Sequence, residues 1–377
     1  MNNGDAFRVI DLFCGCGGMS LGARQAGFNI IAGFDTDERA LETYRRNFGD
    51  NIGFSVDLNK INPQDITKHF NLKPEKLDLL IGGPPCQGFS KNVPRRHRFL
   101  EDPRNMLVNK FLEYVECLRP LVLIMENVAE IKNGFEGTYT SEIKERLLKA
   151  GYEVDLKVIY APDFGAPQRR RRAFFFANRL GIPVSFPEPT HVSTKEFILF
   201  GETQPEYVTV ADAIGDLPSL EHGQGEDPME YKNSPSNDFQ ISARQNSKFL
   251  HDHVARRLTD NQYQRLASIK AGQGAKDLPD HLKPKSHYSG AYGRLAWDSI
   301  APTITRWVFH PGSGRFGHPS DIRVITIREA ARLQSFSDDF SFCGTYIQKS
   351  HQVGNAVPPV VMKALAEKAR ELLISVG

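Results

Sequence analysis

The stretch Leu77-Asp-Leu-Leu-Ile-Gly-Gly-Pro-Pro-Cys-Gln-Gly-Phe-Ser90 joins a short apolar run to a rigid turn. The run from Leu77 to Ile81 is too short for a helix and is typical of a buried strand that ends at a glycine pair. Pro84 and Pro85 then fix two φ angles and remove two backbone donors, so the segment cannot continue the sheet. Cys86 therefore stands beyond the end of a strand, where α/β proteins place their chemistry. A thiolate there would be a nucleophile, whereas many free cysteines are simply small buried apolar residues.

Short apolar runs alternate with helical patterns over residues 8–177. The expected strands are Arg8–Phe13, Asn29–Phe34, Leu77–Ile81, Leu121–Met125, Glu153–Ile159 and Ala173–Ala177. The expected helices are Met19–Ala26, Glu38–Asn47, Met106–Cys117 and Ser141–Ala150. This alternation predicts an α/β fold with a doubly wound, mostly parallel sheet.

The pattern changes after Pro183. Proline, glycine, serine and asparagine interrupt residues 187–290, and the hydrophobic periodicity fades. We therefore expect a second, smaller domain over residues 184–325 that is irregular and β-rich. Helical patterns at Thr326–Gln334 and Val360–Val376 follow it.

The charge is distributed unevenly in this second region. Residues 186–238 carry eleven acidic side chains and two lysines, a local charge of −9. Residues 239–316 carry twelve lysines and arginines and five aspartates, a local charge of +7, with tryptophan and tyrosine among them. Charge runs are commonly solvated faces, but a basic segment with interspersed aromatic residues fits a polyanionic partner better.

The composition excludes several classes of protein. The 377 residues are 40% hydrophobic and 24% charged, as in ordinary soluble proteins, and no apolar run approaches the ~18 residues of a membrane span. No signal-peptide pattern opens the chain, and five cysteines are too few for a disulfide framework, so we expect a cytoplasmic protein without a membrane partner. Cys14 and Cys16 have no second ligand pair at a suitable spacing, so no metal site is expected.

Two further strand ends carry groups that suit a ligand. Gly15, Gly17 and Gly18 follow the first strand and open a helix, where a backbone can approach an anion closely, although the spacing is not that of a dinucleotide site. Asp35 ends the second strand, where an acid can bind ribose hydroxyls or, alternatively, cap the helix that begins near Glu38.

Glu126 follows the apolar strand Leu121–Met125, which places its carboxyl group near the Cys86 thiol. Such a glutamate is commonly a solvated turn residue, but beside a nucleophile it is a candidate acid.

In these segments and several others, the chain resembles the bacterial-type cytosine-5 DNA methyltransferases. The matching segments are Asp11–Gly18, Gly82–Ser90, Glu126–Val128, Gln168–Arg172, Arg328–Phe336 and Gln352–Pro359. The resemblance implies a Rossmann-like catalytic methyltransferase domain over residues 1–183 and 341–377, and a target-recognition domain over residues 184–340. It also implies a monomer that acts on double-stranded DNA, either alone or with a cognate restriction endonuclease.

The resemblance implies a covalent mechanism. Cys86 would add to C6 of a flipped-out cytosine, Glu126 would hydrogen-bond or protonate N3, and Arg172 would meet O2, with Arg170 supporting the Cys86 loop. Without the resemblance, the four arginines 169–172 would be taken as a surface charge run.

The resemblance also implies S-adenosyl-L-methionine as cofactor. The implied cofactor-binding residues are Phe13, Gly15, Gly17, Gly18, Asp35, Thr36, Asp57, Leu58, Pro84 and Asn355. Thr36 departs from the family, where this position is often large and apolar, so it offers adenine little stacking.

The expected DNA-binding residues are Gln87, Ser90, Lys91, Arg95, Arg96, Arg98, Arg294 and Arg306. Residues 91–104 resemble the family's loop that closes on DNA, with a plain basic surface loop as the alternative. Arg294 and Arg306 either contact DNA or have a structural role in the core of the small domain.

Three other functions are weighed against this one. An RNA cytosine-5 methyltransferase would share the motifs, but RNA-directed relatives tend to have a shorter recognition region than the long basic segment here. A catalytically silent DNA-binding homologue is disfavoured by the intact Cys86, Glu126 and Arg172. A dinucleotide oxidoreductase would need a different glycine spacing.

Overall fold

A single seven-stranded sheet forms the centre of the first compact unit, which comprises residues 1–160, 171–188 and 359–377. The structure is a computed structural model and describes residues 6–73, 75–85, 106–193, 204–245, 247–285 and 290–376. The strands are β1 (Arg8–Leu12), β2 (Asn29–Asp35), β3 (Gly53–Ser55), β4 (Leu79–Gly82), β5 (Val122–Val128), β6 (Glu153–Tyr160) and β8 (Arg171–Asn178). Their order is β3-β2-β1-β4-β5-β8-β6, and β8 is antiparallel to both of its neighbours. The predicted α/β fold with a mostly parallel sheet is confirmed.

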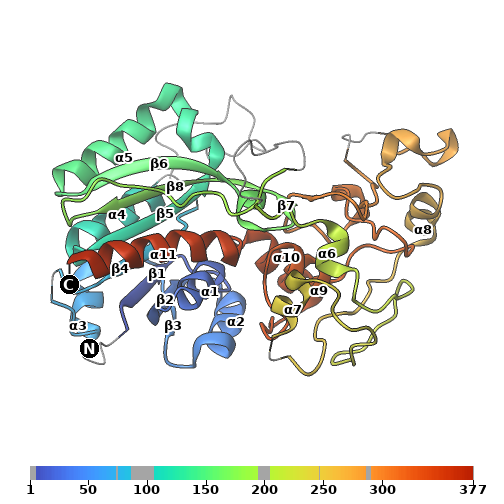
Figure 1. Cartoon of the computed structure of the whole chain (residues 1–377), viewed down its shortest axis with the longest axis horizontal. Helices are drawn as coiled ribbons and strands as arrows, with labels where there is room; N and C mark the ends of the chain where they lie inside the picture. The colour runs from blue at the N-terminus through green and yellow to red at the C-terminus, as the bar shows by residue number, and fades with distance from the viewer. Residues whose placement is uncertain are drawn as a thin grey trace. The chain divides into compact units, whose positions relative to one another are not determined.

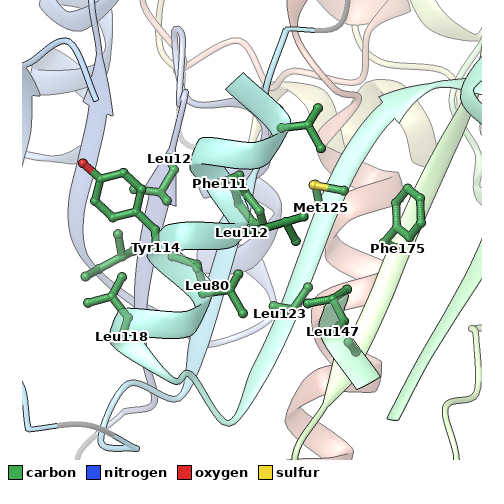
Figure 2. Packing of buried hydrophobic residues seen from close by; sticks show 14 of the residues in the cluster. Leu12, Leu80, Phe111, Leu112, Tyr114, Leu118, Leu123, Met125, Leu147 and Phe175 are labelled. Carbon is green, nitrogen blue, oxygen red and sulfur yellow. The ribbon is translucent and has the colours of Figure 1, made fainter. Parts of the chain in front are cut away.

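Helices cover both faces of the sheet (Figure 1). On one face lie α4 (Met106–Leu118) and α5 (Thr138–Lys149), and on the other lie α1 (Gly18–Gln25) and α11 (Pro359–Val376). Figure 2 shows the core beneath α4, where side chains of the strands and helices interdigitate. The labelled strand residues there are Leu12, Leu80, Leu123, Met125 and Phe175. They point to one face because successive strand residues alternate between the two faces of a sheet.

The first and last helices of this unit pack very closely. A Cβ atom on Gly22 of α1 would lie 2.5 Å from the carbonyl oxygen of Pro359 in α11, so only glycine fits there. The C-terminal helix α11 therefore packs directly against α1, the first helix of the chain.

The six predicted strands and six predicted helical segments all form, with ends shifted by at most three residues. Three further described elements of this unit were not predicted, β3, α3 (Pro63–His69) and the 3-10 helix η4 (Ala129–Gly137), and α2 (Glu38–Phe48) ends one residue later than expected. None of the described helices is long and apolar enough to cross a membrane.

The second compact unit comprises residues 161–170 and 189–358. Its helices in the described part of the chain are α6 (Val210–Ile214), α7 (Asp238–Arg244), α8 (Asp260–Ala267), α9 (Ile327–Leu333) and α10 (Tyr346–Asn355). The strands there are the two-residue β7 (Gln168–Arg169) and β9 (Ala301–Pro302), which pair in parallel. The unit is irregular, as predicted, but it contains less strand than the β-rich expectation. The assignment of 1–183 with 341–377 to catalysis and of 184–340 to recognition stays a prediction.

Buried arginines hold the irregular backbone of this second unit. Arg332 donates to the carboxylates of Asp216 and Asp338 at 2.5 and 2.6 Å, and Arg323 pairs with Glu329 at 2.8 Å. All five side chains are at most 3% exposed. Removing one partner of such a pair leaves an unpaired buried charge and costs about 3–5 kcal/mol, so these pairs specify the packing of the loops.

Candidate active site

The turn after β1 is built for close approach to the backbone. Phe13, Gly15 and Gly17 have positive φ angles of 61°, 54° and 98°, and α1 begins at Gly18. A Cβ atom on Gly15 would meet nothing within 4 Å, so open space lies over this turn. The N–H groups at the start of α1 have no partner within the helix and favour an anionic group.

Asp35 is fixed against the glycine turn. One carboxylate oxygen accepts from the Gly15 N–H at 2.8 Å, and the other accepts from the N–H groups of Thr36 and Asp37 at 2.7 and 2.9 Å. The N-cap of α2 is Asp37, which accepts from the N–H groups of Arg39 and Ala40. The helix-capping alternative for Asp35 is therefore wrong. Its carboxylate is held at the strand edge, where its remaining lone pairs suit hydroxyl donors.

Asp57 lies at the same edge of the sheet. The register pairs Asp35 with Ser55, the last residue of β3, and Asp57 follows two residues later. Asp57 is half-buried and lies 3.4 Å from the Lys60 ammonium group, and the Leu58 side chain is buried. Thr36 is exposed, so it forms no apolar wall here.

Glu126 meets Arg172 at the ends of β5 and β8. The Arg172 Nε lies 2.8 Å from the Glu126 Oε1, with the two side chains 23% and 14% exposed. A Cβ atom on Gly83 would lie 3.2 Å from the other carboxylate oxygen of Glu126, which places this carboxyl directly over the glycine pair. Because Glu126 lies within β5 and is ion-paired, the solvated-turn alternative is wrong.

Asn127 ties the start of the proline turn to this site. Its side-chain amide donates to the carbonyl oxygen of Pro84 at 3.1 Å, and both residues are buried. Sequence reasoning did not assign Asn127 a role, although its place beside Glu126 in a strand-end motif was a usable signal.

The predicted nucleophile and six of the predicted DNA-binding residues fall outside the part of the chain that the structure describes. The predicted residues Cys86, Gln87, Ser90, Lys91, Arg95, Arg96 and Arg98 lie outside the described residues. The described chain stops at Pro85, directly after the segment that Asn127 and Glu126 contact.

The four consecutive arginines do not form one charged surface. Arg170 is 2% exposed and donates to the carbonyl oxygens of Ile304 and Gly354 at 3.1 and 3.2 Å, within the second unit. The surface-run alternative is wrong for Arg170 and for the ion-paired Arg172. Asn355, the last residue of α10, is exposed.

The two candidate DNA-reading arginines differ sharply. Arg294 is 7% exposed, and its guanidinium donates to the backbone carbonyls of Ile269, His318, Pro319 and Asp321 at 2.9–3.3 Å. This geometry favours the structural alternative for Arg294. Arg306 is exposed, with its guanidinium 5.4 Å from the centre of the Trp307 ring, so it stays a candidate for DNA contact.

Asp11 is a buried acid of this site that sequence reasoning left without a role. It is 0% exposed in β1, and its Oδ2 accepts from the Ser20 hydroxyl at 2.6 Å. Its Oδ1 has no hydrogen-bond partner among the described residues. Burial raises the pKa of Asp11 to about 7, with a further increase from the charge of Asp35. The signal in the sequence was an acid inside an apolar strand.

Cys14 and Cys16 are buried beside Asp11. Burial raises the pKa of both thiols, that of Cys16 to about 12, so they are protonated and poor metal ligands. No group of three histidines, cysteines or acids in the described ranges is arranged to hold a metal ion.

The fold and the strand-edge groups define an α/β methyltransferase. A solved DNA modification methyltransferase encoded within an E. coli prophage matches 98% of this chain and 100% of its own chain, with a TM-score of 0.78 and 28% identity. The family model of the C-5 cytosine-specific DNA methylases matches residues 7–371. The chain belongs to this family and is a DNA (cytosine-5)-methyltransferase.

Curated relatives agree with this assignment. The Type II methyltransferase M1.HphI of Haemophilus parahaemolyticus is 36% identical over 95% of this chain and 85% of its own length. The Type II methyltransferase M.AgeI of Thalassovita gelatinovora is 31% identical over 96% of this chain and 98% of its own length. The resemblance that the sequence motifs indicated is confirmed.

Proposed function

We propose that this enzyme methylates C5 of a cytosine flipped out of a specific double-stranded DNA sequence, through a covalent adduct between Cys86 and C6. The observation that carries the proposal is the Glu126–Arg172 ion pair over Gly83. The Glu126 carboxylate of this pair lies over Gly83, and Gly83 precedes Cys86 by three residues in the sequence. Donors at N3 and O2 would stabilise the negative charge that a nucleophile at C6 pushes into the cytosine ring.

The chemistry follows from the weak nucleophilicity of C5. When the Cys86 thiolate forms a bond to C6, the C5–C6 double bond is lost and electron density moves toward N3 and O2. The Glu126 carboxyl group donates its proton to N3 and the Arg172 guanidinium donates a hydrogen bond to O2, and both stabilise this charge. The enamine-like C5 would then accept the methyl group from the cofactor's sulfonium, whose C–S bond would break to leave a neutral thioether. Removal of the C5 proton by a base re-forms the double bond and expels the thiolate.

The cofactor would lie along the edge formed by β1, β2 and β3. S-adenosyl-L-methionine, when bound, supplies an electrophilic methyl group on a sulfonium. The glycine turn after β1 fits its amino-acid end, Asp35 fits the ribose hydroxyls and Asp57 fits the adenine amino group. The open space over Gly15 and the anchored Asp35 carboxylate support this fit. Asn355 and Phe13 stay proposed contacts of the methionine end.

The proposed substrate is duplex DNA, because the enzyme family acts on DNA. C5 is inaccessible inside a stacked duplex, so the base must be extruded before the reaction. We propose that the basic residues 91–104, which lie outside the described residues, contact the DNA backbone during this step. The names of the enzyme's relatives, which are Type II methyltransferases, also support a place in a restriction-modification system with a cognate endonuclease. We further propose that the enzyme acts as a cytoplasmic monomer.

Covalent trapping tests this function. A duplex that contains 5-fluorocytosine should form a denaturation-resistant complex with the wild type and S-adenosyl-L-methionine, because fluorine cannot leave as the proton does. Cys86→Ser should form none while still binding DNA. Trapping by the serine variant would refute the role of Cys86.

The substrate class needs a second arm of the same experiment. Equal concentrations of duplex DNA and structured RNA, each with 5-fluorocytosine, should give trapping with DNA alone. Preferential trapping of RNA would refute the DNA substrate. Bisulfite sequencing of DNA from a host that expresses the enzyme then identifies the methylated sequence.

A further inference from the structure

The second unit contains a cavity of about 690 Å³ whose lining carries three cations, Arg169, Lys276 and Arg315. No carboxylate lines it in the part of the chain that the structure describes, so its local charge is +3. None of the three side chains forms an ion pair with another described residue. Hydroxyl groups such as those of Thr303 and Ser313 add further hydrogen-bonding capacity. A cavity of this size and charge suits an anionic ligand.

Two local pairings bring these residues together. The pairing of β7 with β9 sets Arg169 opposite Pro302, another residue of the lining. Residues 293–295 lie beside 315–317: the Gly317 N–H donates to the Gly293 carbonyl at 2.9 Å, and the Leu295 N–H donates to the Gly317 carbonyl at 2.8 Å. The cavity wall is therefore hydrogen-bonded backbone.

Arg315 is oriented by this wall. A Cβ atom on Gly293 would lie 2.7 Å from the Arg315 Cγ and 3.1 Å from its Nε, so the stem of Arg315 lies directly on the glycine. Holding the stem reduces the side-chain entropy that a ligand contact would cost. A fixed, planar guanidinium has the fork geometry that pairs with O6 and N7 of guanine.

Lys276 and Arg169 are different in kind. Both side chains are exposed. An ammonium on a flexible stem contacts phosphate as a point charge and carries little sequence information.

We propose that this cavity is a DNA-contact site in which Arg315 reads a guanine of the recognition sequence while Lys276 and Arg169 hold phosphates. This inference rests on the proposed function and assigns its sequence selectivity to a named residue. It also explains the buried Arg294, whose carbonyl accepts from the N–H of Gly272 in the lining at 3.1 Å. Arg294 holds the backbone beside the cavity through its hydrogen bonds, whereas the Arg315 side chain lines the cavity.

Two substitutions of Arg315 distinguish a contribution to base discrimination from a contribution of its charge to affinity. Arg315→Lys keeps the charge and most of the stem but loses the fork, so it should keep its affinity for nonspecific duplex and lose roughly 10- to 100-fold of discrimination at one G·C pair. Arg315→Ala should lose the same discrimination. Lys276→Ala should weaken binding to all duplexes alike and lower the salt slope of log affinity by about 1. Arg257→Ala is the matched control, since Arg257 is an exposed arginine of the same unit outside the lining.

The measurements are bisulfite methylation maps and DNA affinities between 50 and 200 mM salt, for the recognition duplex and for duplexes changed at single base pairs. Relaxation at one base pair in both Arg315 variants, with Arg257→Ala unchanged, supports the proposal. An unchanged map in both variants overturns it, and so does a uniform loss of affinity without relaxation. If the wild type methylates no DNA, the proposed function fails, whereas the binding data still judge the cavity by themselves.

Discussion

Replacing Asp11 with asparagine tests the electrostatics of the strand edge in isolation. Asp11 is 0% exposed, and its carboxyl faces the Ser20 hydroxyl, with the charge of Asp35 nearby. Burial disfavours the ionised form and raises the pKa from 3.8 to about 7. Asparagine has the same shape and can still accept the Ser20 hydroxyl, so the exchange removes the titration and little else.

The direction in which stability changes with pH follows from proton linkage. Since the folded state holds this proton more tightly than the unfolded state, the contribution of Asp11 to stability is fully present below pH 3.8 and is lost as the pH rises through 7. A shift of about three units corresponds to about 4 kcal/mol in all, of which about 2–3 kcal/mol falls between pH 5 and pH 8. The wild type should therefore lose this much stability relative to Asp11→Asn over that range.

Urea unfolding of both proteins at pH 5, 6, 7 and 8 measures the difference, because the midpoint and slope give the free energy of unfolding at each pH. Asp50→Asn removes an exposed carboxyl from the same unit and serves as the control. Parallel curves for the wild type and Asp11→Asn would refute the reasoning, since they would mean that Asp11 ionises equally easily in both states.

Four further substitutions test the assigned roles. Arg294→Ala should lower the free energy of unfolding by about 3 kcal/mol in urea titrations, because buried carbonyls lose a charged donor, and its methylation map should not relax. Arg306→Ala should change that free energy by less than about 0.5 kcal/mol, and a fall in DNA affinity would identify it as a contact. Asp35→Ala should weaken binding of S-adenosyl-L-methionine about 10- to 100-fold in calorimetry. Glu126→Gln should lower the single-turnover rate about 100-fold or more with cofactor affinity unchanged, and the reverse pattern would contradict its role.

The sheet was predictable because its strands carry strong local signals. Apolar runs such as Leu79–Gly82 are buried on both faces and end at glycine or proline, so their positions can be read from composition alone. The strand Gly53–Ser55 was missed because three residues, of which one is buried, show no periodicity. The helix Pro63–His69 was missed although Asn62 caps it and Pro63 opens it, a start signal that the sequence does contain.

The second unit was less predictable because long-range polar contacts hold it rather than periodic apolar faces. Arg332 in α9 donates to the Ala213 carbonyl and to Asp216, more than a hundred residues earlier in the chain. No window of sequence contains both partners of such a contact. The sequence pattern therefore showed where regular structure ends, but it overestimated the strand content of the second unit.

Two arginines of the basic segment 239–316 show why residue type alone could not separate a proposed base contact from a structural role. Arg294 and Arg315 lie in the same basic segment, and each directly follows a glycine. Their roles diverge only when residues 293–295 pair beside 315–317, which directs one guanidinium toward the backbone carbonyls of His318 and Pro319 and lays the other over Gly293. Burial then decides: the inward guanidinium is saturated by protein acceptors, and the outward one retains its donors for a ligand. A sequence-based search for base-reading arginines therefore needs the pairing of the backbone before it can choose between them.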